Sequence, residues 1–223
     1  MNAISSTYAL VLKDFRSELR TRYAVNALIM FVVTAVAVIM FALREDHPGN
    51  DVLAGMFWVV VFFTGMSGLS RSFVSEEERG TSMTLQLVAS STVVYFGKLL
   101  FNVILTLAMV LAVTILYMLV FSGFVIETFS IFIVTVILGS LGLASAATII
   151  AAIIAKANTR GTLYPVLSFP ILIVLLMTVM SATSKALDGL ELSAAYSDFV
   201  VLGSYCMVMT AGSWIFFDYV WKD

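Results

Sequence analysis

Long apolar runs separated by short polar stretches dominate this chain. A helix rises about 1.5 Å per residue and the hydrocarbon core of a bilayer is about 30 Å thick, so a membrane span needs about 20 apolar residues. Six runs approach or exceed this length, and none of them contains Lys or Arg, which are costly at the centre of a span. The predicted spans are residues 24–43, 52–69, 99–121, 129–155, 162–180 and 199–220.

Residues 1–23 have a different pattern, in which apolar residues recur every three or four positions with charged residues between them. The apolar positions are Ile4, Tyr8, Val11, Leu12, Phe15 and Leu19. This period predicts an amphipathic helix that lies in the membrane interface. The pattern leaves open whether that helix only anchors the chain or has a further role.

Composition and charge support this interpretation. The 223 residues are 61% hydrophobic and 12% charged, whereas soluble domains contain about 25% charged residues. The net charge of -2 gives no reason to expect a nucleic acid as partner. Lys and Arg gather in the N-terminal segment, the second and fourth loops and the tail, so the positive-inside rule places both termini in the cytoplasm.

Small residues and prolines mark two of the spans. The fourth span offers the small residues Gly139, Gly142, Ser145 and Ala146. Helices in lipid approach closely through such residues, so tight helix packing explains them more simply than a substrate path. Pro165 and Pro170 should bend the fifth span and free backbone carbonyls.

The sequence contains no catalytic constellation. A glycine-rich phosphate-binding loop with its Lys is missing, so the chain cannot hydrolyse a nucleotide by that route. His47 is the only histidine and Cys206 the only cysteine, which excludes an intrachain disulfide and a metal site built on His or Cys pairs. His47 could either contact haem or a metal presented by another subunit or simply be solvated.

The longest polar interruption, residues 71–98, is the one loop long enough to dock a partner. Since no charged residue lies mid-span to couple an ion gradient, the energy for any transport must arrive through such a surface. Ser75 could cap a short helix with Glu76–Glu78 in its first turn, and Gly80 would then weaken helix continuation. Met83, Leu85 and Leu87 would supply an apolar contact. The alternative is a solvated acidic loop that keeps two spans apart.

This segment resembles the coupling helix of six-span ABC exporter permeases. The matching residues are Phe73, Glu76, Glu77, Glu78, Arg79, Gly80, Thr81, Leu85 and Leu87, followed by Lys98. Three further segments are more specific: KDFRSELRTRYAVNALIMF at 13–31, LGSLGLASAATIIAAIIAKAN at 138–158 and LSFPILI at 167–173. Together they resemble the haem exporter protein B (CcmB) family, the membrane subunit of the cytochrome c maturation ABC transporter, over nearly the whole chain.

The resemblance implies one all-α domain over residues 1–223, of the ABC exporter permease type. Its parts would be six transmembrane helices, an N-terminal interfacial helix and a cytoplasmic coupling helix in the 71–98 loop. The pair Ser82-Met83 and the segment VASSTVVYF depart from the family pattern, which affects the expected shape of this loop.

The resemblance also implies a non-catalytic subunit of the bacterial inner membrane, with ATP on a partner chain and haem as possible cargo. Its expected partners are an ABC ATPase, a second copy of itself, a haem-handling membrane subunit, a small tail-anchored subunit and a periplasmic haem chaperone. Either haem passes through this subunit, or ATP hydrolysis releases the loaded chaperone. The alternatives are an ABC exporter for a lipid, drug or peptide, and a mechanical scaffold that transports nothing.

Overall fold

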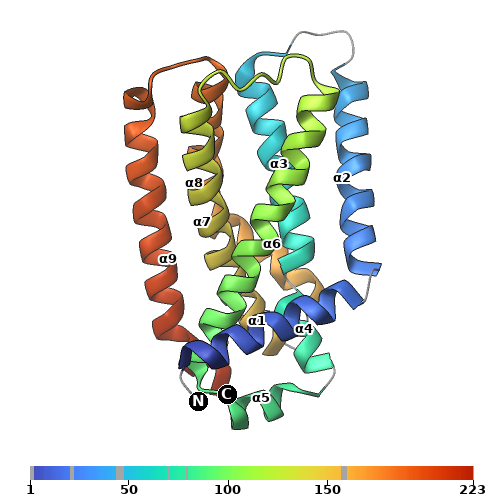
Figure 1. The fold of residues 1–223 in the computed structure, drawn as a ribbon, viewed down its shortest axis with the longest axis vertical. Coiled ribbons are helices and arrows are strands. Elements are labelled where there is room, and N and C mark those ends of the chain that lie inside the picture. The colour runs from blue at the N-terminus through green and yellow to red at the C-terminus, as the bar shows by residue number, and fades with distance from the viewer. Residues whose placement is uncertain are drawn as a thin grey trace.

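The computed structural model describes residues 3–20, 23–43, 48–69, 71–78, 80–156 and 160–222, and these contain helices and connecting turns but no strand. Five helices are long and apolar enough to cross a membrane: α3 (Asn50–Leu69), α6 (Ser91–Val120), α7 (Phe129–Lys156), α8 (Arg160–Leu187) and α9 (Tyr196–Lys222). A sixth, α2 (Tyr23–Ala42), runs beside them and contributes the shorter apolar stretch Leu28–Ala42 (Figure 1). The protein is therefore a multi-pass helical membrane protein.

Three short or oblique helices gather at one end of this bundle. They are α1 (Ala3–Arg20), α4 (Arg71–Glu78) and α5 (Ser82–Val88), and both ends of the chain lie at the same end (Figure 1). The connections 121–128 and 188–195 lie at the other end, the second of them containing the 3₁₀ helix Leu192–Ala195. The bundle thus has one end built of helices and one built of loops.

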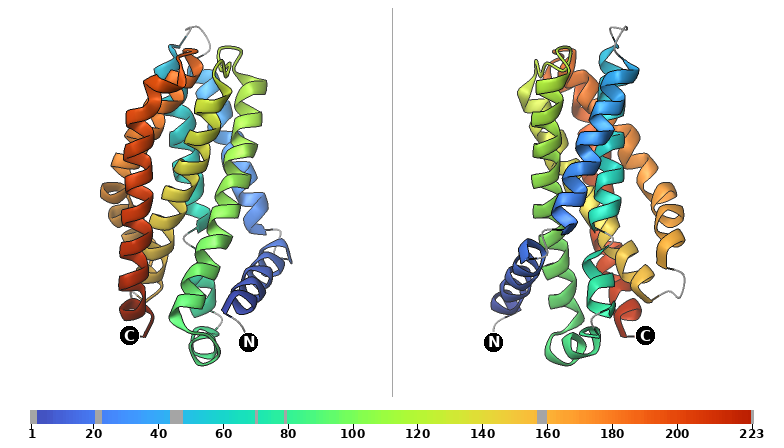
Figure 2. Two further views of the ribbon diagram at one scale, coloured as in Figure 1. Left: turned by 60° about the vertical axis from the view of Figure 1, so that its left-hand side comes forward. Right: turned by 90° about the vertical axis from the view of Figure 1, so that its right-hand side faces the viewer.

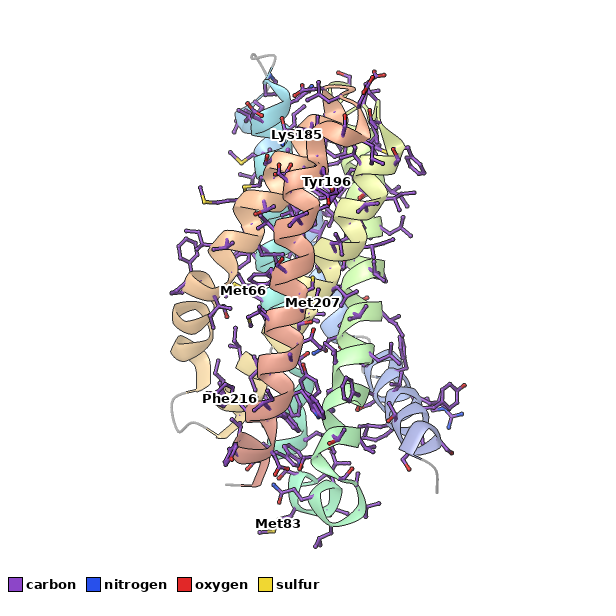
Figure 3. All side chains as sticks on the ribbon, turned by 90° about the vertical axis from the view of Figure 1, so that its left-hand side faces the viewer. Met66, Met83, Lys185, Tyr196, Met207 and Phe216 are labelled. Carbon is purple, nitrogen blue, oxygen red and sulfur yellow. The ribbon has the colours of Figure 1, made fainter. Side chains whose placement is uncertain are left out.

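α7 occupies the centre of the bundle. In its most apolar stretch 78% of the residues are buried inside the protein, against 17% for α9. The exposed side chains of α9 include Tyr196, Met207 and Phe216, which point away from the bundle in Figure 3. These exposed residues suit contact with lipid, because the apolar surface of a membrane protein faces hydrocarbon.

Two spans are longer than their apolar runs. α6 begins at Ser91 rather than Leu99, and α8 ends at Leu187 rather than Met180. Polar side chains in these extensions have partners, as Thr183 accepts a hydrogen bond from Trp58 Nε1 at 2.8 Å and Lys185 Nζ lies 2.7 Å from Asp198 Oδ2. Hydropathy alone ends a span at its first polar residues, whereas the helix continues wherever those residues are satisfied.

α8 leaves the bundle along its lower half (Figure 2, right). Pro165 and Pro170 both belong to this half of the helix. A proline removes one backbone hydrogen bond and clashes with the preceding turn, which is the usual cause of a kink. Their role in bending α8 remains a prediction.

Candidate functional site

The polar segment between α3 and α6 folds differently from its prediction. α4 begins at Arg71, so Ser75 lies in the interior of the helix and does not cap it, and the three glutamates occupy the C-terminal turn instead of the first. Phe73 explains the earlier start, because its buried ring packs 5.7 Å from the rings of both Phe217 and Trp221 on α9. The helix therefore includes Phe73 in its first turn, where this apolar contact holds it against α9.

Gly80 ends α4 in the way that glycine commonly ends helices. Its φ of +65° is left-handed, a conformation that glycine adopts without steric cost. The Thr81 N–H donates to the Glu76 carbonyl at 3.0 Å, and the Gly80 N–H donates to the Glu77 carbonyl at 3.1 Å. This pair of bonds is a Schellman motif, which satisfies carbonyls at the helix end. The chain then turns directly into α5.

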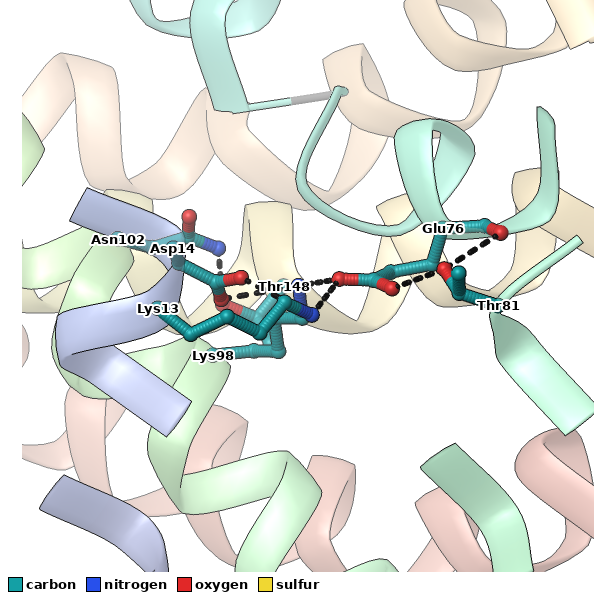
Figure 4. Close-up of polar contacts among 7 residues, drawn as sticks. All are labelled: Lys13, Asp14, Glu76, Thr81, Lys98, Asn102 and Thr148. Atoms are coloured by element: carbon teal, nitrogen blue, oxygen red, sulfur yellow. Dashed lines mark hydrogen bonds and ion pairs between the residues drawn. The ribbon is translucent and has the colours of Figure 1, made fainter. Parts of the chain in front are cut away.

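A buried ion cluster joins α1, α4 and α6 (Figure 4). Lys98 Nζ lies 2.9 Å from Asp14 Oδ2 and 3.1 Å from Glu76 Oε1. Lys13 Nζ donates to Glu76 Oε1 and lies 3.6 Å from Asp14 Oδ1. The side chains of Lys98, Asp14 and Glu76 are only 2%, 8% and 7% exposed, whereas that of Lys13 is 47% exposed. One buried ammonium and one at the protein surface therefore balance the charge of two buried carboxylates.

Glu76 is held in its ionised form. Burial would raise the pKa of its carboxyl, but the charge of Lys98 and the hydrogen bonds from Lys13 and Thr81 outweigh burial and lower the pKa to about 2. The Thr81 hydroxyl donates to Glu76 Oε2 at 2.6 Å. Ionised Glu76 therefore accepts bonds from α1, α6 and the start of α5.

This shifted pKa predicts a pH dependence. Because the pKa of Glu76 in the folded protein lies below the ordinary glutamate value of 4.5, ionised Glu76 contributes its full stability above about pH 4.5 and loses it as pH falls through about 2. The difference in unfolding free energy between the wild type and Glu76→Gln should be constant from pH 8 to about 5 and shrink below about 4.5. Thermal unfolding in detergent at several pH values measures it. A difference that shrank between pH 8 and pH 6 would contradict the depressed pKa.

The cluster continues into the centre of the bundle through α6. One turn beyond Lys98, Asn102 is fully buried, and its Nδ2 donates to Thr148 Oγ1 on α7 at 2.9 Å. The Thr148 hydroxyl in turn donates to the Ala144 carbonyl at 2.6 Å. α6 is therefore linked by polar contacts to α1 and α4 on one side and to the central helix on the other.

α5 presents an apolar face outward. Met83, Leu87 and Val88 are 76%, 88% and 81% exposed, and Figure 3 shows Met83 pointing away from the molecule at its end. Leu85 packs against the core, and Gln86 Nε2 donates to the backbone carbonyl of Trp221. α5 is thus fixed to the bundle by one face and leaves the other face exposed.

The structure divides the predicted coupling residues into two groups. Phe73 and Glu76 are buried, Thr81 bonds Glu76, Gly80 forms the turn and Leu85 is partly buried. Glu78 and Leu87 are exposed, and Glu77 is half-buried. Arg79, like the predicted loop histidine His47, lies outside the described residues. The motif therefore contains buried residues that hold the segment against the bundle as well as exposed residues.

The small residues of α7 lie where helices approach closely. A Cβ on Gly139 would come 2.7 Å from Trp58 Cη2, and one on Gly142 would come 2.7 Å from Leu175 Cδ1. Ala146 is fully buried, and the Ser145 hydroxyl lies 3.0 Å from Thr210 Oγ1 on α9. Their neighbours here are other helices of the same chain.

The sequence did not mark Lys13 and Asp14 as part of a site, and it marked Lys98 only as the lysine that follows the coupling motif. Asp14 lies on the face of α1 that packs against α6, together with buried Leu10 and Val11, while Tyr8, expected on the apolar face, is 67% exposed. A signal existed, because Asp14 interrupts the apolar stripe between Val11 and Phe15. An acidic residue in such a stripe indicates a basic partner, because a buried charge is costly unless it is paired.

A cavity of about 540 Å³ opens between α2 and α6. Its lining is apolar except for Glu18 and Thr64, so it could receive the apolar part of a lipid or cargo molecule. Among the described residues no group of three or more His, Cys, Asp or Glu side chains could hold a metal ion.

Residues 5–213 match a family model described as CcmB protein, which covers α1 to most of α9. A comparison with curated proteins finds no match. The family match includes the ion cluster, the segment 71–88 and the central helix. The chain accordingly belongs to the CcmB family, the haem exporter component of the cytochrome c maturation ABC transporter.

Proposed function

We propose that this protein is the permease subunit on which a separate ABC ATPase acts during c-type cytochrome biogenesis, with α5 and the end of α4 as its docking element. The observation that carries the docking assignment is the exposed apolar face formed by Met83, Leu87 and Val88. Figure 1 places α5 beyond α1, at the far end of the molecule. Large apolar side chains gathered on a polar connecting segment are typical of a protein interface.

The assignment refines the role of the acidic motif. Glu76 is saturated by Lys13, Lys98 and Thr81, and Phe73 is buried on α9, so neither is free to contact a partner. In our proposal these two residues position the segment, while Glu78 and the exposed face of α5 contact the ATPase. ATP is hydrolysed on the partner, and this chain contributes mechanical transmission.

The proposed assembly follows the family. It contains a second copy of this chain, two ATPase subunits, a haem-handling membrane subunit, a small tail-anchored subunit and a periplasmic haem chaperone. Six spans with both termini in the cytoplasm of a bacterial inner membrane are consistent with the shared position of the chain ends, α4 and α5 (Figure 1). The transmitted motion would drive haem delivery, either by export through this subunit or by release of the loaded chaperone.

Substitution of the α5 face tests the docking element. Met83→Asp with Leu87→Asp should reduce the co-purifying ATPase by at least about 30-fold, since a desolvated contact residue contributes about 2 kcal/mol or more. Covalent c-type cytochromes should be lost in the same cells, while the amount of the permease in the membrane is unchanged. Affinity purification and haem staining measure these quantities.

The matched control places the same two changes at the opposite end of the molecule. Leu190→Asp with Leu192→Asp alters residues that are 43% and 51% exposed and should leave the ATPase bound. If the α5 variant bound the ATPase as well as the wild type does, α5 would not be the docking element. Normal c-type cytochromes in a strain lacking the protein would refute the haem role, and ATP-dependent haem arrival in vesicles distinguishes export from chaperone release.

A further inference from the structure

α1 is packed into the bundle through direct contacts with α6. Gly97 allows a close approach, since a Cβ at this position would come 2.6 Å from Leu10 Cδ2. One turn further along both helices, the rings of Phe15 and Phe101 meet edge to face with centroids 5.2 Å apart. An interfacial helix that served only as an anchor would not need a glycine-sized gap in a neighbouring span.

The ammonium group of Lys98 lies where three elements meet. It contacts Asp14 of α1 at 2.9 Å and Glu76 of α4 at 3.1 Å, and it lies 5.7 Å from the centroid of the Phe73 ring on α4. Because Lys98 itself belongs to α6, one buried charge connects α1, α4 and α6. Separating any of the three would leave a buried charge without its partner, which is strongly unfavourable.

The joined elements lie on the route from the docking face to the membrane. α5 follows α4 through the Gly80 turn, and α6 extends from this point for 30 residues, or about 45 Å, to the other end of the bundle. A displacement delivered to α5 therefore reaches α6 through the α4 side of the cluster and α1 through the Asp14 side.

We propose that Asp14 and Lys98 are positioning residues that make α1 part of the coupling unit, so that α1, α4 and the cytoplasmic part of α6 move as one rigid body during the ATP cycle. This inference rests on the proposed function, because it assumes that the ATPase acts through α5. It assigns to the N-terminal helix a mechanical role in addition to membrane anchoring.

A disulfide between α1 and α6 tests whether these two helices keep a fixed position relative to each other during the ATP cycle. In a Cys206→Ser background, Leu10→Cys with Gly97→Cys places two thiols on positions whose Cβ atoms lie 3.3 Å apart, close to the roughly 3.8 Å typical of a disulfide. The oxidised and reduced forms of the purified complex should show the same ATPase rate and the same haem output per ATP. Loss of output on oxidation, restored by reductant, would show that α1 slides on α6 and would overturn the inference. Failure of the pair to oxidise would overturn the packing on which it stands.

The substitution Asp14→Asn tests whether Asp14 is needed for coupling or has no effect on it. The ATPase should still co-purify and hydrolyse ATP, but haem output per ATP should fall by about ten-fold, within the usual range of coupling between sites. Adding the Leu10→Cys and Gly97→Cys disulfide to Asp14→Asn should restore the output on oxidation, because a covalent bond replaces the lost ion pair. Wild-type output from Asp14→Asn, or no recovery on oxidation, would refute the inference. Absence of the ATPase from the wild-type complex would instead refute the proposed function.

Discussion

Replacing Lys98 with Met should lower the free energy of unfolding by about 3–5 kcal/mol, because removal of one member of a buried ion pair leaves uncompensated charge. The two carboxylates left without their shared cation are Asp14 and Glu76. Lys13 remains, but its side chain is 47% exposed, and a solvated ammonium cannot replace a buried one. Denaturant or thermal unfolding in detergent, together with the amount of protein in the membrane, measures the loss.

The control for Lys98 is the same substitution in a more exposed pair. Lys185 Nζ lies 2.7 Å from Asp198 Oδ2, but the Lys185 side chain is 27% exposed, so Lys185→Met should cost only about 1 kcal/mol. A triple variant with Lys98→Met, Asp14→Asn and Glu76→Gln should recover part of the stability, since it removes the unpaired charges as well. Equal losses for Lys98→Met and Lys185→Met would mean that the cluster does not hold the three helices together.

Gly139→Ala should destabilise the protein by about 1–3 kcal/mol through overpacking. The added methyl group would come 2.7 Å from Trp58 Cη2 and 3.0 Å from Val179 Cγ1. Trp58 cannot easily move aside, because it is buried and its indole N–H donates to Thr183 at 2.8 Å. The loss is measured as a shift in the unfolding midpoint of the purified protein.

Two other glycines allow the loss of stability at Gly139 to be compared with sites that have more room. At Gly142 the nearest atom, 2.7 Å away, is the end of the flexible Leu175 side chain, so Gly142→Ala should cost less. At Gly212 nothing lies within 4 Å, so Gly212→Ala should be neutral or stabilising, because alanine is favoured over glycine in helices by up to about 1 kcal/mol. If all three variants behaved alike, close packing of α7 against its neighbours would be disproved.

Periodicity and hydropathy predicted the helices but not the ends of all of them. The apolar runs locate α3, α7 and α9 to within a few residues, because lipid imposes length and apolarity on any span. They miss the first turns of α6, where Lys98 is tolerated only because Asp14 and Glu76 surround it. Such a contact joins residues far apart in the chain, which a local pattern cannot reveal.

The candidate site was predicted only in part, again because contacts between residues far apart in the chain decide the rest. The motif from Phe73 to Leu87 correctly marked a distinct segment with a turn at Gly80. Capping rules then placed the glutamates in a first turn, as the helix dipole favours. The dipole contributes about 0.3–1 kcal/mol, less than burial of Phe73 and the pairing of Glu76 with two lysines. Tertiary contacts therefore outweighed the local preference.

The zero net charge of the ion cluster has a consequence for the energetics of the proposed rigid body. An electric potential across a bilayer does work of about 2.3 kcal/mol per 100 mV on each elementary charge that crosses it. In the proposed rigid body the two lysines and two carboxylates travel together and carry no net charge, so the membrane voltage neither assists nor opposes the displacement of these four groups. The cluster therefore adds no voltage-dependent contribution of its own to the free energy of the proposed movement.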